Sequence, residues 1–244
     1  MKWKDHVKIT AEICGHFGLK NCREIAQASV LPDKDPDHYW AFGRRGRAYL
    51  RRVPHHELIA IGYALLHLKR ARRLYLRNKR YYEFLGRALH YLQDYAVDPT
   101  ENIWIFSYRS ELAHEKREKL DLSVDFNAVK NAMDKKCYPH EFKSFVFKTK
   151  RGKNADEIVF ASSYLTALAF KMLLNPDKPE KLEEEYGKAK ITHIVLLIIP
   201  WIFLIALVQG LAYLFLSAIA SAILHLADYN YHKWKLDYDW FNTS

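Results

Sequence analysis

The sequence predicts an all-α protein in which a multi-helix domain is followed by a C-terminal membrane helical hairpin. Apolar residues recur three and four positions apart through most of residues 1–175, which is typical of amphipathic helices. Strand-like alternation is scarce before Phe142. From Ile191 to Leu226 no residue carries a formal charge, and such a stretch is typical of a membrane segment.

The apolar spacing locates the individual helices of the first domain. In chain order they are expected over Asp5–Phe17, Asn21–Val30, Glu57–Leu76, Tyr81–Ala96, Ser110–Leu120 and Asp156–Leu174. Asp98-Pro99 stops the fourth of these, because proline disfavours helical backbone in the residue before it. The segment Pro32–Asp37 is expected to be a loop, and Phe142–Lys150, which alternates, a strand or an extended loop.

Composition divides the chain into four parts. These are a helical metal-binding domain at 1–175, a charged linker at 176–190, a hydrophobic hairpin at 191–228 and an aromatic polar tail at 229–244. One unbroken helix over Ile191–Leu226 would be about 54 Å long, beyond the ~30 Å of a hydrocarbon core. The stretch must therefore break, and Gln209-Gly210 is the predicted hinge between two apolar arms. The competing interpretation is a hairpin buried in a soluble protein.

Basic residues exceed acidic ones, with 38 Lys and Arg against 28 Asp and Glu. Lysines flank both arms of the hairpin, so the positive-inside tendency predicts a membrane protein whose N-terminal domain faces the cytoplasm. Between residues 41 and 80 Glu57 is the single acid among many arginines. Such a field attracts phosphate from lipid headgroups or from nucleic acid, and the hairpin favours membrane lipid as the partner.

The three cysteines, Cys14, Cys22 and Cys137, have no metal-ligand spacing. Neither a disulfide framework nor a zinc ribbon is therefore predicted, and a reducing compartment is expected. The N-terminus lacks the apolar core of a secretory signal, so export of the first part of the chain is not expected.

Histidines recur beside carboxylates at helical spacing. His90 and Asp94 are four residues apart, as are His114 and Glu118, so each pair projects from one face of a helix. Imidazoles and carboxylates held on helices are suitable ligands for a hydrolytic zinc site. Further candidates are His6 near the start, Asp33, and the adjacent His55 and His56.

The segment Arg87–Asp94, followed by Pro99 and Asn102, resembles the signature helix of the zinc-dependent phospholipases C. That family shares an all-helical fold and a trinuclear zinc site with fungal single-strand nucleases. Its ligand order, carried onto this chain, falls on His6, Asp33, His55 or His56, His90, Asp94, His114 and Glu118. Spacing does not distinguish His55 from His56, and His56 is preferred because it abuts the following helix.

Two departures from the family pattern bear on the number of metals. The family's first Trp is the N-terminal residue and binds zinc through its own amino and carbonyl groups, whereas Trp3 follows two residues. The family also has a second His shortly after the signature Pro, where this chain has Asp98-Pro99-Thr100-Glu101-Asn102. The position of Trp3 makes two zinc ions the expectation rather than three. The missing imidazole means that one site has lost a strong ligand, unless Asp98 or Glu101 replaces it.

The resemblance implies a membrane-anchored zinc-dependent phosphoesterase acting on phospholipid or a related phosphate ester. In that interpretation Asp94 bridges two metals, and Asp33 binds metal or acts as general base toward the attacking water. One alternative keeps the fold and takes single-stranded nucleic acid or nucleotides as substrate. Another is a degenerate, non-catalytic membrane scaffold. The oligomeric state is left open.

Overall fold

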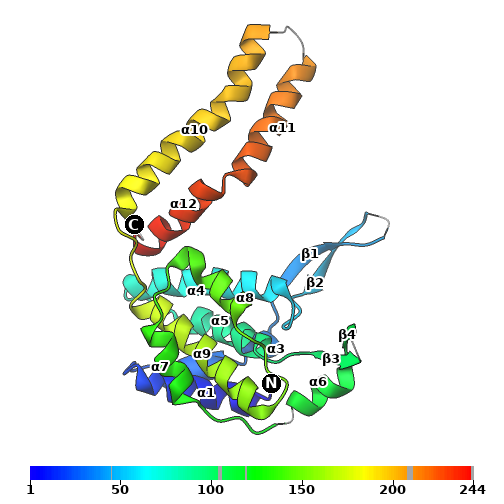
Figure 1. Cartoon of the computed structure of the whole chain (residues 1–244), viewed down its shortest axis with the longest axis vertical. Coiled ribbons are helices and arrows are strands. Elements are labelled where there is room, and N and C mark those ends of the chain that lie inside the picture. The colour runs from blue at the N-terminus through cyan, green and yellow to red at the C-terminus, as the bar shows by residue number, and fades with distance from the viewer. Residues whose placement is uncertain (45, 104–105, 119, 208–210, 243–244) are drawn as a thin grey trace. The chain divides into compact units, whose positions relative to one another are not determined.

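The computed structural model describes residues 1–44, 46–103, 106–118, 120–207 and 211–242 (Figure 1). This part of the chain is mostly helical, as expected. It divides into two compact units, of which the first comprises Met1–Cys137 with Glu141–Asp177. The second comprises Tyr138–His140 with Lys178–Ser244.

The first unit contains nine helices and two small antiparallel sheets among its described residues. In chain order these elements are α1 (Trp3–His16), α2 (Cys22–Ala28), α3 (Leu31–Lys34), β1 (His38–Phe42), β2 (Ala48–Arg52), α4 (Leu58–Leu76), α5 (Tyr82–Tyr95), β3 (Thr100–Ile103), β4 (Phe106–Arg109), α6 (Glu111–Glu118), α7 (Phe126–Asp134), α8 (Phe142–Lys148) and α9 (Ala155–Leu174). The helices expected from apolar spacing are thus present, with ends shifted by a few residues.

Helix α5 lies inside the first unit and packs against α2, α4 and α9. Every residue from Leu85 to Tyr95 is buried, including the polar ones. Gly86 allows α2 to approach closely, since a Cβ at that position would lie 2.4 Å from the Cβ of Ala28. The polar residues buried on α5 therefore belong to a fixed, tightly packed element.

Helix α9 is the one described helix that is long and apolar enough to cross a membrane. Its most apolar stretch is 72% buried, because α9 packs against α1, α4, α5 and α7. Burial of this kind is also what the core helix of a soluble domain shows. The length and composition of α9 are therefore weak support for membrane association.

Several segments differ from the prediction. Pro32–Asp37 was expected to be a loop, yet its first residues belong to α3, because proline is tolerated in the first turn of a helix. Helix α7 was not predicted.

Phe142–Lys150 was expected to be extended, yet most of it forms helix α8, in which Phe142 and Val146, one turn apart, are buried. The paired strands β1–β2 and β3–β4 were not predicted. Gly43 and Gly46 allow the tight turn between β1 and β2, where Gly46 has φ +69°.

The expectation of unpaired cysteines was wrong for two of the three. Cys14 and Cys22 form a disulfide that joins the end of α1 to the start of α2, and Cys137 is a buried thiol outside this disulfide. The spacing gave no indication of this pair, because the two cysteines meet through the turn that brings α2 back along α1.

The second unit contains helices α10 (Leu182–Leu207), α11 (Leu211–Ala227) and α12 (Tyr229–Phe241). Helix α10 begins inside the expected linker, and α12 occupies the expected tail. Helices α10 and α11 pack together, and the hydroxyls of Ser217 and Ser221 donate to the carbonyls of Pro200 and Leu197. The predicted hinge, Gln209-Gly210, lies outside the described residues.

Candidate metal centre

Two helices supply the buried half of a cluster of ligand-type side chains. His90 and Asp94 lie one turn apart on α5, and His6 lies on α1. The His6 and His90 rings stack with their centroids 4.4 Å apart, and both side chains are fully buried. His90 Nε2 is 3.2 Å from Asp94 Oδ2, and His6 Nε2 is 3.1 Å from Asp94 Oδ1.

The partly open half of the cluster comes from α3 and from the segment before α4. His55 Nδ1 lies 2.9 Å from Asp94 Oδ2 and 3.0 Å from His90 Nε2. Asp33 Oδ1 lies 3.6 Å from both His55 Nδ1 and His90 Nε2. The Asp33 and His55 side chains are 28% and 21% exposed, so solvent reaches the cluster from this side.

Hydrogen bonds to the outer ring nitrogens leave the inner ones able to bind a cation. The Nδ1 of His90 is 2.8 Å from the carbonyl oxygen of Ser29, which only accepts, so Nδ1 carries the proton. The Nδ1 of His6 is 2.6 Å from Oε1 of Gln93 and likewise donates. With Nδ1 donating in both rings, the lone pair of the neutral imidazole is on Nε2, the atom that faces Asp94, as metal ligands require.

Gln93 fixes the tautomer of His6. Its amide nitrogen donates to the hydroxyls of Thr10 and Thr166, at 3.0 and 3.1 Å, and its amide oxygen is therefore the atom that faces His6. His6 Nε2 is buried and makes no hydrogen bond despite its proximity to Asp94. A buried lone pair without a donor, beside a carboxylate, fits a site for a cation.

The surroundings of Asp94 hold its carboxylate in the charged form. Burial raises the pKa of Asp94, but the charge of the nearby Met1 amino group and the neighbouring imidazoles outweigh it and hold that pKa well below its usual range. Burial lowers the pKa of His90, which keeps the ring neutral. Burial also disfavours the charged form of His55, but Asp94 outweighs it and raises the pKa of His55.

The structure brings together two groups of three ligand-type side chains. They are His6 with His90 and Asp94, and Asp33 with His55 and His90. Of the predicted ligands, His6, Asp33, His90 and Asp94 thus lie together. His55 lies in the cluster in place of the preferred His56, whose Nδ1 instead donates to the backbone carbonyl of Asp94.

The second predicted pair is not described. The backbone of α6 carries His114 and Glu118, but their side chains lie outside the described residues, as does that of Glu101. The Asp98 carboxylate, considered as a replacement ligand, accepts from the backbone nitrogen and hydroxyl of Thr100 at 2.8 and 2.7 Å. Asp98 therefore stabilises the turn after α5.

Sequence reasoning missed the residues that support the ligands. Trp3 donates its indole N–H to Asp33 Oδ2 at 2.6 Å, and Ser29 and Gln93 orient two of the histidines. The sequence offered one signal for these supporting residues. Gln93 is a polar residue directly before Asp94, in a predicted helix that is otherwise rich in apolar residues.

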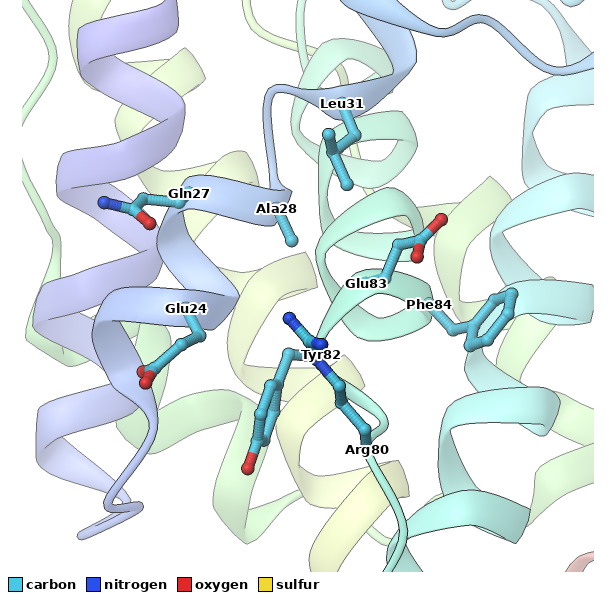
Figure 2. A pocket seen from close by; sticks show the side chains of 8 residues that line it. All are labelled: Glu24, Gln27, Ala28, Leu31, Arg80, Tyr82, Glu83 and Phe84. Carbon is cyan, nitrogen blue, oxygen red and sulfur yellow. The ribbon is translucent and has the colours of Figure 1, made fainter.

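A cavity of about 380 Å³ lies near the other end of α5 (Figure 2). Glu24, Gln27 and Ala28 line one side of it, and Glu83 and Phe84 line the other. No residue of the cluster lines this cavity, so it is separate from the candidate metal centre.

The chain matches no protein-family model, no curated protein and no solved structure. Three imidazoles and two carboxylates, partly open to solvent, form a donor set suited to zinc or another divalent transition metal.

Proposed function

We propose that this protein is a membrane-anchored, metal-dependent phosphoric ester hydrolase. The observation that carries the proposal is the convergence of His6, Asp33, His55, His90 and Asp94 from α1, α3, α5 and the segment before α4. The likeness of Arg87–Asp94 to the signature helix of zinc-dependent phospholipases C supports the same reaction class.

The buried residues would hold zinc. Asp94 directs Oδ1 toward His6 Nε2, and Oδ2 toward His55 Nδ1 and His90 Nε2. Asp94 and these inner ring nitrogens are therefore the groups that would hold the metal. When bound, zinc would supply positive charge for the phosphate oxygens and would lower the pKa of a water.

Asp33 has the position of a general base. It lies on the solvent side of the cluster, and Trp3 fixes one of its carboxylate oxygens. The other oxygen faces His55 and His90, where it would accept a proton from a water attacking phosphorus. Trp3 thus orients Asp33 without touching the reacting atoms.

Helices α10 and α11 support membrane attachment. Both expose large apolar side chains along their length, namely Ile191, Ile194, Val195, Ile198, Ile202, Leu214, Phe215, Leu216, Ile219 and Ile223. Exposing apolar surface to water costs about 25 cal/mol per Å², and contact with the hydrocarbon of a bilayer removes that cost. The proposed substrate is accordingly a phospholipid or a related phosphate ester.

The purified full-length protein tests the proposal. We expect bound zinc and chelator-sensitive hydrolysis of bis(p-nitrophenyl) phosphate, with phospholipid vesicles and a single-stranded oligonucleotide as parallel substrates. Asp94→Asn and His55→Gln should lower activity by more than the 10–100-fold typical of outer-shell residues. His16→Gln, at an exposed histidine outside the cluster, is the control. Purified protein that binds no metal, or hydrolysis that both variants retain, would contradict the proposal. Cleavage of the oligonucleotide alone would mean that the substrate is a nucleic acid and not a phospholipid.

A further inference from the structure

The β1–β2 hairpin of the first unit is strongly basic. Residues 38–52 contain no acid and five arginines, which are Arg44, Arg45, Arg47, Arg51 and Arg52. The backbone nitrogen of Gly43 donates to the carbonyl of Arg47 at 3.0 Å, which closes the turn and brings arginines to the end of the hairpin. A positive tip of this kind attracts an anionic surface.

The strand register gathers the most exposed large apolar side chains of the hairpin on one face. Trp40 pairs with Leu50, and Phe42 pairs with Ala48, and paired residues in antiparallel strands project to the same side. Trp40, Phe42 and Leu50 are 65%, 76% and 57% exposed. The same face carries the His38–Arg52 pair at the base of the hairpin, and the opposite face carries Tyr39, Ala41, Tyr49 and Arg51. The hairpin therefore presents three exposed apolar side chains, here called the apolar face, beside its arginines.

Two hydrogen bonds among the described residues lie at the base of the hairpin. The hydroxyl of Tyr63, on α4, donates to the carbonyl of His38 at 2.7 Å, and the backbone nitrogen of Val53 donates to the carbonyl of Asp37 at 2.9 Å. Figure 1 shows the two strands extending away from the helices of the first unit toward the turn. The Trp40, Phe42 and Leu50 side chains are correspondingly exposed.

We propose that the β1–β2 hairpin docks the first unit onto an anionic lipid surface. Arginines near a membrane are drawn to acidic headgroups, and Trp and aromatic rings prefer the headgroup level. Leu50 and Phe42 would enter the outer hydrocarbon while the tip arginines extend back to phosphate. The inference uses no residue of the metal cluster, so it does not depend on the proposed hydrolysis.

A single nucleic-acid strand is the competing partner, since arginines and aromatic rings also bind bases. The composition of the apolar face favours lipid. It combines Leu50 and Ala48 with Trp40 and Phe42. Its polar pair, His38 and Arg52, lies at the base of the hairpin, away from the turn.

An environment-sensitive fluorophore at the hairpin tests the inference in the full chain. Phe42→Cys is labelled with nitrobenzoxadiazole and mixed with vesicles of phosphatidylcholine, with or without phosphatidylglycerol. The native cysteines do not interfere, because Cys14 and Cys22 are paired and Cys137 is buried. Tyr49→Cys, labelled on the opposite face of the same hairpin, is the matched control.

We expect a blue shift and a gain in emission for the label at position 42 on anionic vesicles, and no shift at position 49. The double variant Arg44→Glu/Arg47→Glu should abolish that shift. An equal response on neutral vesicles, or no response from protein that sediments with anionic vesicles, would overturn the inference. So would a blue shift produced by a single-stranded oligonucleotide in place of the vesicles.

Discussion

Gln93 connects the candidate metal centre to the core of the helical unit. Its amide oxygen accepts from His6, and its nitrogen donates to Thr10 and Thr166. Replacing it by Leu leaves the Nδ1–H of His6 buried without an acceptor, which costs about 1–3 kcal/mol of stability. Because the tautomer of His6 is then unconstrained, we expect zinc affinity to fall about 10–100-fold in a calorimetric titration.

Thr166→Val is the control for this prediction. It removes one partner of the Gln93 nitrogen but leaves the amide oxygen facing His6. We expect lower stability with unchanged zinc affinity. Equal loss of affinity in both variants would mean that packing, and not the orientation of His6, governs binding.

Asp37 makes the stability of the fold pH-dependent. Burial alone would raise its pKa, but hydrogen bonds from His67 and Tyr91 and the charge of Arg87 lower that pKa to about 2. An unfolded Asp has a pKa of about 3.9, so the folded state binds fewer protons between these values. The resulting stabilisation, about 2 kcal/mol, is complete above about pH 5 and is lost as the pH falls toward 2.

Urea denaturation of the wild type and of Asp37→Asn at pH 6 and pH 3 checks this prediction. We expect the difference in free energy of unfolding between the two proteins to shrink at pH 3, since the Asn side chain does not titrate. A difference that is the same at both pH values would show that Asp37 acts through packing alone.

Helical spacing predicted that His90 and Asp94 lie together, whereas the other described members of the cluster were reached from the ligand order of the family that the chain resembles. His90 and Asp94 share a face of α5 because helical geometry requires it. The residues His55 and His56 precede α4, and no periodicity determines which of two neighbours points inward. The supporting hydrogen bond from Trp3 to Asp33 depends on the packing of α1 near α3, which local sequence does not encode.

At the level of the elements, Gly86 fixes the position of α5 against α2. A Cβ at Gly86 would lie 2.4 Å from the Cβ and 2.5 Å from the backbone carbon of Ala28. Since backbone cannot yield as a flexible side chain does, Gly86→Ala should destabilise the protein by about 1–3 kcal/mol. His90 and Asp94 lie on the same helix, so metal affinity should also fall.

Gly62→Ala is the matched variant on α4. A Cβ there meets no atom within 4 Å, and Ala is favoured over Gly in a helix by about 0.5–1 kcal/mol. We therefore expect the same substitution to stabilise α4 and to destabilise α5 in chemical denaturation. Destabilisation by both would indicate that Gly86 has no special role.

The elements that were mispredicted show where pattern analysis fails. Phe142–Lys148 contains both a two-residue and a four-residue apolar period, and burial of Phe142 and Val146 selects the helix. The β1–β2 hairpin has no buried face, so it lacks the alternation of apolar and polar residues that marks a half-buried strand. Its glycines were its clearest signal.

At the level of the whole molecule, two features predict opposite sides of a membrane for the first unit. The lysines beside the apolar arms favour the cytoplasm, whereas the Cys14–Cys22 disulfide is typical of an oxidising compartment. We expect one free thiol per chain in protein denatured without reductant. Because that disulfide closes a short loop, Cys14→Ser/Cys22→Ser should cost about 2.5 kcal/mol. Three free thiols in protein taken from cells would instead agree with the cytoplasmic side.

Membrane attachment of the second unit predicts the behaviour of the whole chain during alkaline carbonate extraction. The intact protein should stay in the membrane pellet, because the apolar surface of α10 and α11 is held by hydrocarbon and not by charge. Charged substitutions at Ile198 and Ile219, which are 47% and 55% exposed, should release it. Release of the unaltered protein would contradict insertion.

The two serine hydroxyls between α10 and α11 bear on the order of assembly. Ser217 and Ser221 already donate across the helix pair, to Pro200 and Leu197, so neither has to find a partner after entering hydrocarbon. Both serines lie on α11, so α11 entering the lipid without α10 would carry two hydroxyls that lack these partners. A helical hairpin in which these hydroxyls are already paired can enter a bilayer as one preassembled unit. Separating α10 from α11 inside the membrane would then be harder than inserting the two helices together.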